Sequence, residues 1–366
     1  MNEVTNVLPE IKIGIMPLTD TAPLIVAQEN GYFAKHGLSV SLKMQSSWAS
    51  LRENLHKGQI DCAQMLAPMP FESQLALSNQ AQPVITPFIL SKNGNAVTIS
   101  SSLYREITKK LGYPPLLPMC ASVLKSLIKS YKRQGRKLTF AVVYQHSCHY
   151  YQLKSWLIAG QVNPKDIEIV IISPCNITAA LAAGDIDGFC SGEPWNTIAA
   201  REGSGYTVVA APDIWSNVPE KVLGLLSTYY EAHKAEVFKL ILALIEACQW
   251  LEGTANRFEA ALMLSKSCYL NTALENIAPS LIGSGIIHRD MMPRELAKYH
   301  QFYHLHQELG NSPDIGYGAR ILNYMVEMNH ISSIQAKRCN IAKIYRADIY
   351  QSAMAMLFEQ RLARCT

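Results

Sequence analysis

The sequence is poor in charged residues and lacks any long apolar run. Of its 366 residues, 17% are Asp, Glu, Lys or Arg, and the formal net charge is only +4. The densest basic cluster, Lys132-Arg133 with Arg136-Lys137, is typical of a solvated helix end and too small for a nucleic-acid surface. No apolar stretch reaches the length of a membrane span. We therefore expect neither direct nucleic-acid binding nor membrane insertion. Because 49% of the residues are hydrophobic, the chain can still fill a sizeable core.

The N-terminal stretch lacks the features of an export signal. Residues 1–20 contain no basic segment followed by an apolar segment, and no small-residue cleavage site. The nine cysteines are scattered, odd in number and free of CxxC spacing, and the first is Cys62. Such cysteines are typical of reduced core thiols, so we expect a cytoplasmic protein.

Motifs of the common enzyme and cofactor-binding classes are also missing. The sequence contains no GxGxxG, no P-loop, no HExxH and no GxSxG. His300, His304 and His306 cluster along the chain, but no Cys or carboxylate completes a metal-binding set at the usual spacing. A polar helix face is therefore favoured there. We predict a protein without catalysis, cofactor or metal.

An alternation of strands and helices is present, and it occurs twice. Apolar periodicity predicts strands at 11–16, 38–44 and 60–65, with helices at 23–29 and 47–56. The same order starts again later, with strands at 138–143, 166–172 and 186–190 and helices at 150–159 and 177–183. A βαβαβ order implies a parallel sheet covered by helices.

A short internal repeat supports two related lobes. Leu55-x-x-Gly58-x-Ile60-Asp61 matches Leu181-x-x-Gly184-x-Ile186-Asp187. In both copies a helix ends at a glycine that can adopt a left-handed C-cap, and a strand starts at once.

The last third of the chain is predicted to be helical. Apolar residues at helical spacing indicate helices at 237–251, 255–265, 293–309 and 346–364. A helical tail after two α/β units suits a chain that returns to cover the first unit. We therefore place residues 1–97 and 222–366 in a discontinuous lobe I, and residues 98–221 in lobe II.

Several residues lie where a predicted strand gives way to a helix or to a returning segment. Backbone N–H groups at such junctions point into a cleft, and open parallel sheets bind ligands beyond the carboxyl ends of their strands. The glycine among these residues allows backbone to approach a ligand closely. The candidates are Trp48, His149, Gly192, Glu193, Trp195 and Lys221.

Each candidate also has an ordinary structural interpretation. Trp48 can be a core aromatic, and Lys221 can be a surface lysine. Glu193 can be an acid, a metal ligand or a group that orients another. Cys148 and His149 form a possible nucleophile and base, but adjacent residues on a helix do not face each other.

Five stretches carry a specific combination of motifs. They are Leu18-Thr19-Asp20-x-Ala22-Pro23-Leu24-Ile25-Val26-Ala27, Gly31-Tyr32-Phe33-Ala34-Lys35, Ser47-Trp48, Met65-Leu66-Ala67-Pro68-Met69-Pro70 and Gly192-Glu193-Pro194-Trp195-Asn196. In these stretches the sequence resembles the nitrate and bicarbonate solute-binding family of bacterial ABC importers. The resemblance implies an α/β, two-lobed type II periplasmic-binding-protein fold, with parallel-rich sheets flanked by helices and a helical C-terminal region.

The resemblance also implies a ligand set. Nitrate binders of that family hold the ion with a Trp, an amide side chain, a His, backbone near the Gly-Glu-Pro-Trp segment, and a Lys. The family has Gln where this chain has Asn95. By local motif match, the corresponding residues are Trp48, Asn95, His149, Gly192 and Lys221.

The predicted charges favour nitrate over bicarbonate. Nitrate accepts hydrogen bonds and donates none, so an ammonium group with neutral N–H donors satisfies it. Bicarbonate carries an O–H that needs an acceptor, and Lys221 supplies none. Bicarbonate binders of the family resemble a different plan, with a Glu in place of that Lys and a bound calcium ion. We therefore expect nitrate or nitrite.

The missing export signal resembles the cytosolic branch of this family, the NasS-type nitrate/nitrite sensors. The resemblance implies a NasT-like partner, an RNA-binding antiterminator of nitrate-assimilation genes, which the ligand-free sensor holds and the ligand-bound sensor releases. Lobe closure would drive release if the ion binds the closed state more tightly. Two alternatives stay open: a nitrate-binding component of an ABC importer, and an enzyme on the same fold that uses His146, Cys148 and His149.

Overall fold

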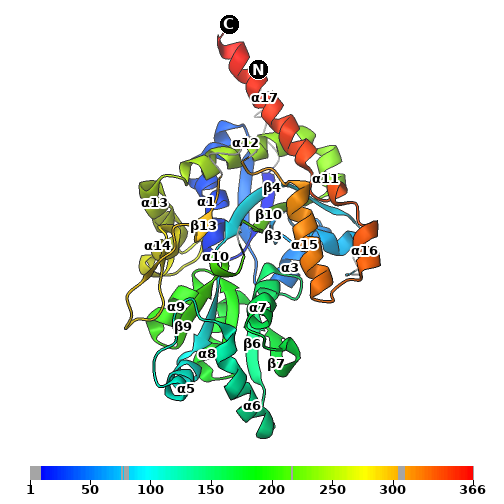
Figure 1. The fold of residues 1–366 in the computed structure, drawn as a ribbon. Helices are drawn as coiled ribbons and strands as arrows, with labels where there is room; N and C mark the ends of the chain where they lie inside the picture. The colour runs from blue at the N-terminus through cyan, green and yellow to red at the C-terminus, as the bar shows by residue number, and fades with distance from the viewer. Residues whose placement is uncertain (1–9, 76, 78–81, 216, 304–309, 366) are drawn as a thin grey trace.

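Two mixed β-sheets, each flanked by helices, form the frame of the computed structural model (Figure 1). The structure describes residues 10–75, 77, 82–215, 217–303 and 310–365. In Figure 1 the larger sheet lies in the upper lobe and the smaller sheet in the lower lobe. This arrangement agrees with the predicted two-lobed α/β class.

The larger sheet has a parallel half and an antiparallel half. Its strands are β1 (Glu10–Ile15), β2 (Ser39–Met44), β3 (Cys62–Leu66), β4 (Val84–Asn93), β10 (Pro219–Leu226) and β13 (His300–Gln301), in the order β13-β4-β10-β3-β1-β2. Strand β1 pairs in parallel with β2 and β3, as the βαβαβ pattern predicts. Strand β10 runs antiparallel to β3 and β4, because it enters from the other lobe.

The smaller sheet repeats this plan. Its strands are β5 (Asn95–Ser100), β6 (Leu138–Val142), β7 (Ile167–Ile171), β8 (Gly188–Gly192) and β9 (Gly205–Ala210), in the order β7-β6-β8-β5-β9. Strand β6 is parallel to β7 and β8, and β5 is antiparallel to β8 and β9. The sheets are therefore mixed rather than parallel-rich, because the strands that pass between the lobes add antiparallel pairs.

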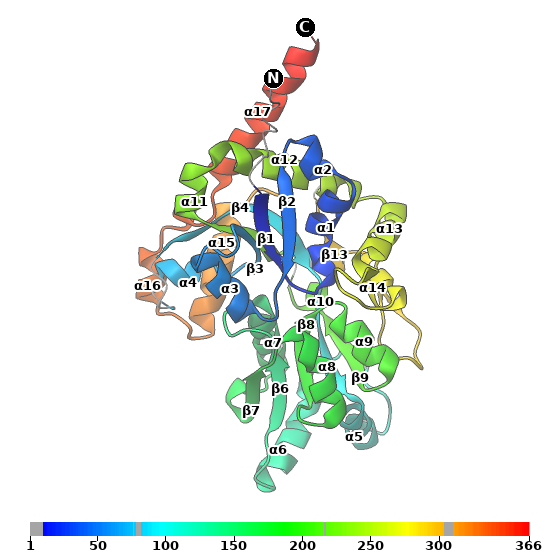
Figure 2. The same ribbon diagram turned by 180° about the vertical axis from the view of Figure 1, so that it is seen from behind.

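Helices pack around both sheets (Figures 1 and 2). With the larger sheet lie the helices η1 (Thr19–Thr21), α1 (Ala22–Glu29), α2 (Tyr32–Lys35), α3 (Trp48–His56), α4 (Phe71–Gln74), α11 (Ser227–Ala232), α12 (Lys234–Trp250), α13 (Thr254–Ser265) and α14 (Leu274–Leu281). With the smaller sheet lie α5 (Ser101–Leu111), η2 (Ala121–Leu124), α6 (Lys125–Arg133), α7 (Cys148–Ala159), η3 (Pro164–Asp166), α8 (Pro174–Ala183), α9 (Trp195–Glu202) and α10 (Ala211–Ile214). After the two-stranded pair β11 (Ser284–Gly285) and β12 (Arg294–Glu295), the C-terminal region contains α15 (Ile315–Glu327), α16 (Ser333–Arg338), η4 (Ile341–Lys343) and α17 (Ala347–Cys365).

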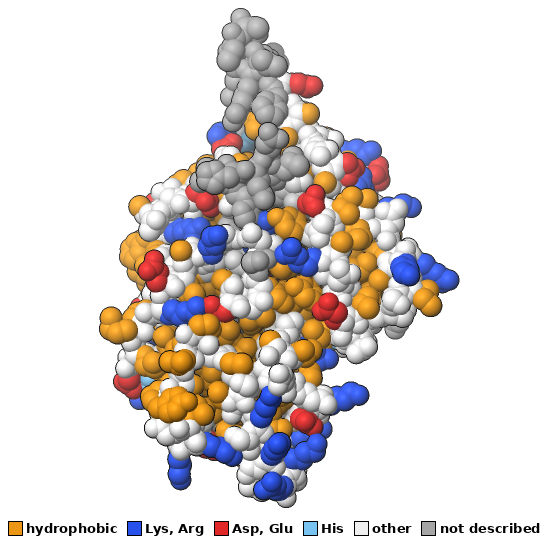
Figure 3. Space-filling view, in the orientation of Figure 1, with side chains coloured by type: hydrophobic (Ala, Val, Ile, Leu, Met, Phe, Trp, Pro, Cys, Tyr) orange, Lys and Arg blue, Asp and Glu red, His pale blue; other side chains and the backbone are white. Residues whose placement is uncertain are grey.

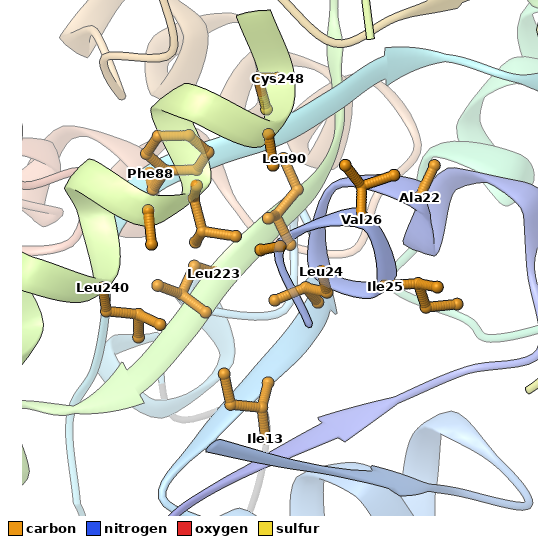
Figure 4. Packing of buried hydrophobic residues seen from close by; sticks show 14 of the residues in the cluster. Ile13, Ala22, Leu24, Ile25, Val26, Phe88, Leu90, Leu223, Leu240 and Cys248 are labelled. Carbon is orange, nitrogen blue, oxygen red and sulfur yellow. The ribbon is translucent and has the colours of Figure 1, made fainter. Parts of the chain in front are cut away.

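The core of the upper lobe lies between the larger sheet and helices α1 and α12. Ile13 from β1, Leu223 from β10 and Leu24 from α1 point toward one another in Figure 4 and are fully buried. Leu240 of α12 covers them from the other side. Burial of each such side chain contributes about 1.5–3 kcal/mol. This packing holds β10 firmly in the sheet.

The internal repeat corresponds to two equivalent pieces of structure. Asp61 donates its backbone N–H to the Lys12 carbonyl at 2.8 Å, and its carboxylate accepts the Lys12 N–H at 2.7 Å. Asp187 makes the same two bonds with Thr139, both at 2.8 Å. The aspartate therefore joins the third strand of each unit to its first. The repeated sequence marks a repeated lobe architecture.

The helix predicted at 293–309 is wrong over the described residues. Residues 293–303 form β12, a turn and β13, and β13 pairs with the edge of β4. Leu296, Tyr299 and Phe302 are three residues apart and buried, and this spacing resembles that of a helix face. His304 and His306 lie outside the described residues.

The surface shows no segment suited to a bilayer in the parts that the structure describes. No helix there is both long enough and apolar enough to cross a membrane. On the face shown in Figure 3, basic and acidic side chains are interspersed with apolar ones.

Two crossings lead from a strand or helix of one lobe directly to a strand of the other within the described residues. Strand β4 ends at Asn93 and β5 begins at Asn95, so Gly94 is the only residue between strands of different sheets. The second crossing runs from α10 to β10. The lobe boundaries at 97/98 and 221/222 stay a prediction.

Gly94 adopts a backbone conformation that residues with a side chain rarely adopt. Its φ is +91°, and a Cβ built on it would lie 2.5 Å from Cε1 of His300. His300 is 1% exposed, and it lies in β13 opposite Asn93. The imidazole therefore packs directly against the crossing.

We expect Gly94→Ala to destabilise the protein more than Gly184→Ala. Both glycines have positive φ, which costs an L residue about 1–2 kcal/mol. Gly184 has no atom within 4 Å of an added Cβ, so only Gly94→Ala adds a collision. Urea unfolding should give a loss of about 1–2 kcal/mol for Gly184→Ala and about 2–4 kcal/mol for Gly94→Ala.

The collision can be tested separately by a double-mutant cycle. Combining Gly94→Ala with His300→Ala should give a coupling of about 1 kcal/mol or more, because the smaller side chain makes room for the methyl group. Equal losses for the two glycine variants and no coupling would contradict this account.

Candidate functional site

Three helices begin at the boundary between the lobes, and each carries a predicted site residue in its first turn. Ser47 caps α3 by accepting the Ser50 N–H at 3.1 Å, and Trp48 follows it. Ser147 caps α7 in the same way, which places His149 in the first turn. Trp195 begins α9. Capping explains why the chain turns before α3 and α7, since it satisfies N–H groups that the helix leaves open, whereas α9 starts after Pro194 without a side-chain cap.

The centre of the site is a buried ion triplet. The Lys221 ammonium lies 2.8 Å from Asp20 Oδ2 and 2.9 Å from Glu220 Oε1. All three side chains are at most 1% exposed. Gln64 holds the second oxygen of Asp20 by donating from Nε2 at 2.9 Å. Lys221, predicted as a ligand-binding cation, is therefore buried between two carboxylates.

A backbone irregularity brings Glu220 and Lys221 to the same place. In a regular strand adjacent side chains point to opposite faces. In β10, Pro219 is opposite Lys92 and Lys221 is opposite Ser91, so one extra residue is accommodated on the β10 side. This bulge turns the Glu220 side chain toward the Lys221 ammonium.

Burial and mutual contact shift the pKa values of these groups. Burial raises the pKa of Asp20, although the nearby Lys221 partly offsets this effect. Burial also raises the pKa of Glu220; the Lys221 ammonium partly offsets this effect, and the negative charge of Asp20 adds a smaller increase. Burial by itself would lower the pKa of Lys221, but the two carboxylates outweigh it and raise the pKa. The lysine is therefore the group whose charge is secure.

His149 and Trp48 face the triplet without hydrogen-bonding partners. His149 is fully buried, and its Nε2 lies 3.6 Å from Glu220 Oε1, beyond hydrogen-bond distance. Burial and the Lys221 charge lower its pKa, so the ring is neutral and one nitrogen keeps a proton to donate. The Trp48 ring centroid lies 5.6 Å from the Lys221 ammonium. The structure brings all three predicted residues together.

Asn95 and Gly192 pair across the neighbouring strands of the smaller sheet. Asn95 Nδ2 donates to Gln152 Oε1 at 2.9 Å, which uses one of the two N–H donors of this amide. A Cβ on Gly192 would lie 3.4 Å from Asn95 Oδ1 and 3.9 Å from Asp20 Oδ2. Gly192 therefore lies between the lobes beside the triplet, where a larger residue would narrow the space.

The carboxylate of Glu193 is hydrogen-bonded to neighbouring residues. Its carboxylate accepts the Tyr299 hydroxyl at 2.5 Å and the Thr197 backbone N–H at 3.0 Å. Its backbone carbonyl accepts the Thr19 N–H at 2.8 Å, which joins η1 to the Gly-Glu-Pro-Trp segment. The carboxylate thus orients the segment. Trp195, partly exposed, packs against the core with its indole Nε1 buried.

Several buried polar atoms around the triplet have no hydrogen-bond partner among the described residues. They come from both lobes, and such atoms are costly unless something binds them. They include Thr19 Oγ1, Trp48 Nε1, Asn95 Oδ1, both ring nitrogens of His149, Ser191 Oγ, Trp195 Nε1 and Thr197 Oγ1.

Sequence reasoning missed Asp20, Glu220 and His300. Asp20 lies in the quoted Leu-Thr-Asp motif, and Glu220 precedes Lys221, so both were visible as motif neighbours. Their convergence depends on the β10 bulge, which no spacing rule predicts. Burial, the charge of Arg257 and the charge of Lys221 together lower the pKa of His300 to about 3, so this ring is neutral.

The prediction that the site lacks an acceptor for the O–H group of bicarbonate is wrong. It rested on the lack of a hydrogen-bond acceptor beside Lys221, but the Asp20 and Glu220 carboxylates are such acceptors. An O–H group on the ligand could be satisfied here.

The candidate nucleophile and base do not pair. Cys148 Sγ donates to the Pro219 carbonyl at 3.4 Å, and burial raises the pKa of its thiol well above the ordinary value. His146 instead contacts Glu72 through Nδ1 at 3.0 Å. A protonated, enclosed thiol is a poor nucleophile. No group of three or more potential metal ligands occurs within the described ranges.

His146 belongs to a bridge between the lobes. Glu72 accepts from Arg52 at 2.8 Å and from the Tyr144 hydroxyl at 3.0 Å, in addition to His146. Arg52 and Glu72 lie in helices α3 and α4, whereas Tyr144 and His146 follow β6. On the same side, Trp215 stacks on Tyr324 of α15 with centroids 3.8 Å apart, which ties the C-terminal region to lobe II.

Two α/β lobes around a buried polar site are the architecture of solute-binding proteins. The crystal structure of the periplasmic nitrate-binding protein NrtA from Synechocystis PCC 6803 matches with a TM-score of 0.85 at 23% identity, covering 96% of this chain and 89% of that chain. The ligand-binding component of an ABC-type import system from Staphylococcus aureus matches with a TM-score of 0.71 at 15% identity, covering 94% and 98%. The predicted two-lobed periplasmic-binding-protein fold is confirmed.

A family model narrows the class. The model of the NMT1-like family matches residues 6–265, and the chain belongs to this family. The nitrate import ATP-binding protein NrtC of Synechocystis sp. is 31% identical over 347 residues, which are 94% of this chain and 49% of that protein. The bicarbonate-binding protein CmpA of Synechococcus elongatus is 32% identical over 281 residues, which are 75% of this chain and 60% of that protein. The chain thus spans only part of the length of these relatives.

We expect His149→Gln to reduce the loss of stability in acid. The folded protein keeps His149 neutral, while the unfolded chain protonates it below about pH 6.5, so stability is lost as pH falls below that value. One such histidine contributes about 1.4 kcal/mol per pH unit. Urea unfolding at pH 6.5 and 5.0 should show that the variant loses about 2 kcal/mol less than the unmodified protein.

The matched control is His36→Gln. The His36 ring lies 2.8 Å from Glu246 and has a carboxylate partner. Between pH 6.5 and 5.0, the His36→Gln variant should lose at least as much unfolding free energy as the unmodified protein. An unchanged loss in His149→Gln would show that His149 is protonated equally in both states.

Proposed function

We propose that the chain binds a small oxyanion of the nitrate, nitrite and bicarbonate class between its lobes, without catalysis. The observation that carries this proposal is the convergence of unpartnered N–H and O–H groups from both lobes around the Lys221 ammonium. Such groups satisfy the oxygens of a compact anion. The names of the relatives NrtA, NrtC and CmpA support the same class of ligand.

Nitrate and nitrite remain the first candidates. Trp48 Nε1 and the neutral His149 are N–H donors, and the fixed charge of Lys221 suits an anion that cannot donate a hydrogen bond. Bicarbonate is the second candidate, because Glu220 offers an acceptor for its O–H group.

We expect Trp48→Phe to weaken nitrate binding while the fold is kept. Phenylalanine retains the buried ring but removes the indole N–H, and a hydrogen bond to a charged group contributes about 1.5–3 kcal/mol. Calorimetric titration should therefore give a dissociation constant about 10- to 150-fold higher.

Trp156→Phe is the control for this variant. Trp156 is buried in the core of lobe II, and its indole donates to the Met119 carbonyl at 2.7 Å. Its replacement removes a comparable hydrogen bond far from the triplet. Weakening of the same size in both variants would assign the effect to folding and remove Trp48 from the site.

A protein that binds such an anion could serve in either of two cellular roles, import or sensing. The import role is favoured by the relatives, since NrtC is named for nitrate import. The sensor role, in a cytoplasmic protein that controls a NasT-like antiterminator, is favoured by the thiols. The described cysteines are free, and four are buried: Cys62, Cys148, Cys190 and Cys248. Free thiols of this kind are typical of a reducing compartment.

The sensor role predicts that nitrate dissociates a complex with a NasT-like antiterminator. Size-exclusion chromatography should show a complex without nitrate and separate proteins with it. In Trp48→Phe the nitrate concentration needed for release should rise by the same factor as the dissociation constant, because the two equilibria are linked. If no complex forms without nitrate, the sensor role is rejected and the import role is retained.

A further inference from the structure

The ion triplet has one negative charge too many for an anion site. The two carboxylates and one ammonium leave a net charge of minus one when all three are ionised, and all three are at most 1% exposed. A proton-free anion bound beside them would raise the buried charge to minus two. Charges in such surroundings are strongly disfavoured unless they are compensated.

Apart from Lys221, no group that faces Glu220 in the part of the chain that the structure describes supplies positive charge. The neighbouring titratable groups are Lys221 on the same strand, Asp20 in η1, Cys148 and His149 in α7, and Cys190 in β8. Burial lowers the pKa of His149 and raises the pKa values of both thiols, so these three groups are neutral. The compensating charge has to come from outside the triplet.

The two carboxylates are held differently. Gln64 donates to Asp20 Oδ1 at 2.9 Å, and Asp20 Oδ2 forms an ion pair with the Lys221 ammonium at 2.8 Å. Gln64 is itself fixed by the Met16 N–H at 3.0 Å and the Thr21 hydroxyl at 2.9 Å. Donors fixed in this way favour ionised Asp20. Glu220 also has partners, the Lys221 ammonium at 2.9 Å from Oε1 and the Asn95 side chain, but the Asp20 charge acts against its ionised form, and it lies next to the His149 ring, on the side where the lobes meet.

We propose that the site takes up its oxyanion together with one proton from solvent, and that the Glu220 carboxyl holds this proton. The inference rests on the anion-binding function proposed above and adds its proton linkage. The added anion carries one negative charge and the added proton one positive charge, so the buried net charge is unchanged. Glu220 is therefore a specificity-determining residue, since its protonated form can donate to the anion and its ionised form repels it.

The test uses sodium nitrate as the probe, because nitrate stays ionised across the accessible pH range and any proton taken up belongs to the protein. Calorimetric titrations at pH 6, 7, 8 and 9, in buffers of different ionisation enthalpy, give the affinity and the number of protons bound. Where free Glu220 is ionised, the affinity of the unmodified protein should fall about tenfold per pH unit, with about one proton taken up per nitrate.

Glu220→Gln and Asp20→Asn are measured side by side, with Glu29→Gln as a control for a carboxylate distant from the triplet. The Glu220→Gln side chain is permanently neutral, so nitrate affinity should become independent of pH and proton uptake should vanish. Asp20→Asn should keep the proton uptake, although its affinity changes. Glu29→Gln should match the unmodified protein. Thermal unfolding confirms that each variant is folded before titration.

The outcomes separate this proposal from the function on which it rests. Nitrate binding with the same affinity at every pH and no proton uptake would overturn the proton linkage and leave the anion-binding function intact. Loss of the pH dependence in Asp20→Asn but not in Glu220→Gln would overturn the assignment to Glu220. No heat with nitrate, nitrite or bicarbonate, at any pH and in any variant, would reject the anion-binding function itself.

Discussion

The contact between the Lys221 ammonium and the carboxylates of Asp20 and Glu220 is the constraint on which the site depends. Three ionisable side chains lie out of water at the point where β10 enters the larger sheet. Removing the ammonium from such a group would leave two buried carboxylates without compensation, which is strongly destabilising. The cluster therefore fixes the position of η1 relative to β10, and with it the backbone that reaches the Gly-Glu-Pro-Trp segment.

The polar groups around this cluster are arranged by ordinary local structure. Capping serines start α3 and α7 at the lobe boundary, and this orients Trp48 and His149. A bulge in β10 adds Glu220, and a glycine at the end of β8 keeps the space beside Asn95 open. Each of these local features is common in proteins. Their coincidence between two lobes produces a concentrated set of donors and acceptors in a place from which water is excluded.

The sequence was a good guide wherever a short-range pattern decided the structure. The βαβαβ order, the helix starts at Trp48 and near His149, and the Asp61 and Asp187 repeat all follow from periodicity and capping. The convergence of Lys221, Trp48 and His149 followed from the family resemblance. The wrong predictions concern segments whose structure depends on pairing with residues far away in the sequence. Leu296, Tyr299 and Phe302 have helical spacing, but the edge of β4 recruits part of this segment as a strand. Glu220 was visible as the neighbour of Lys221, but regular alternation would place its side chain on the opposite face of the strand, and the bulge that reverses this cannot be read from spacing.

The connection through Gly94 has a mechanical consequence. A single residue separates β4 from β5, and the His300 ring fills the space beside it, so the two sheets have no slack in which to slide past each other. A change in the angle between the lobes has to occur as a rotation close to this point. The Arg52, Glu72, Tyr144 and His146 bridge joins the lobes a second time, through side chains rather than through the backbone. The lobes are therefore held together both by a covalent link of one intervening residue and by a set of hydrogen bonds that can break without unfolding either sheet.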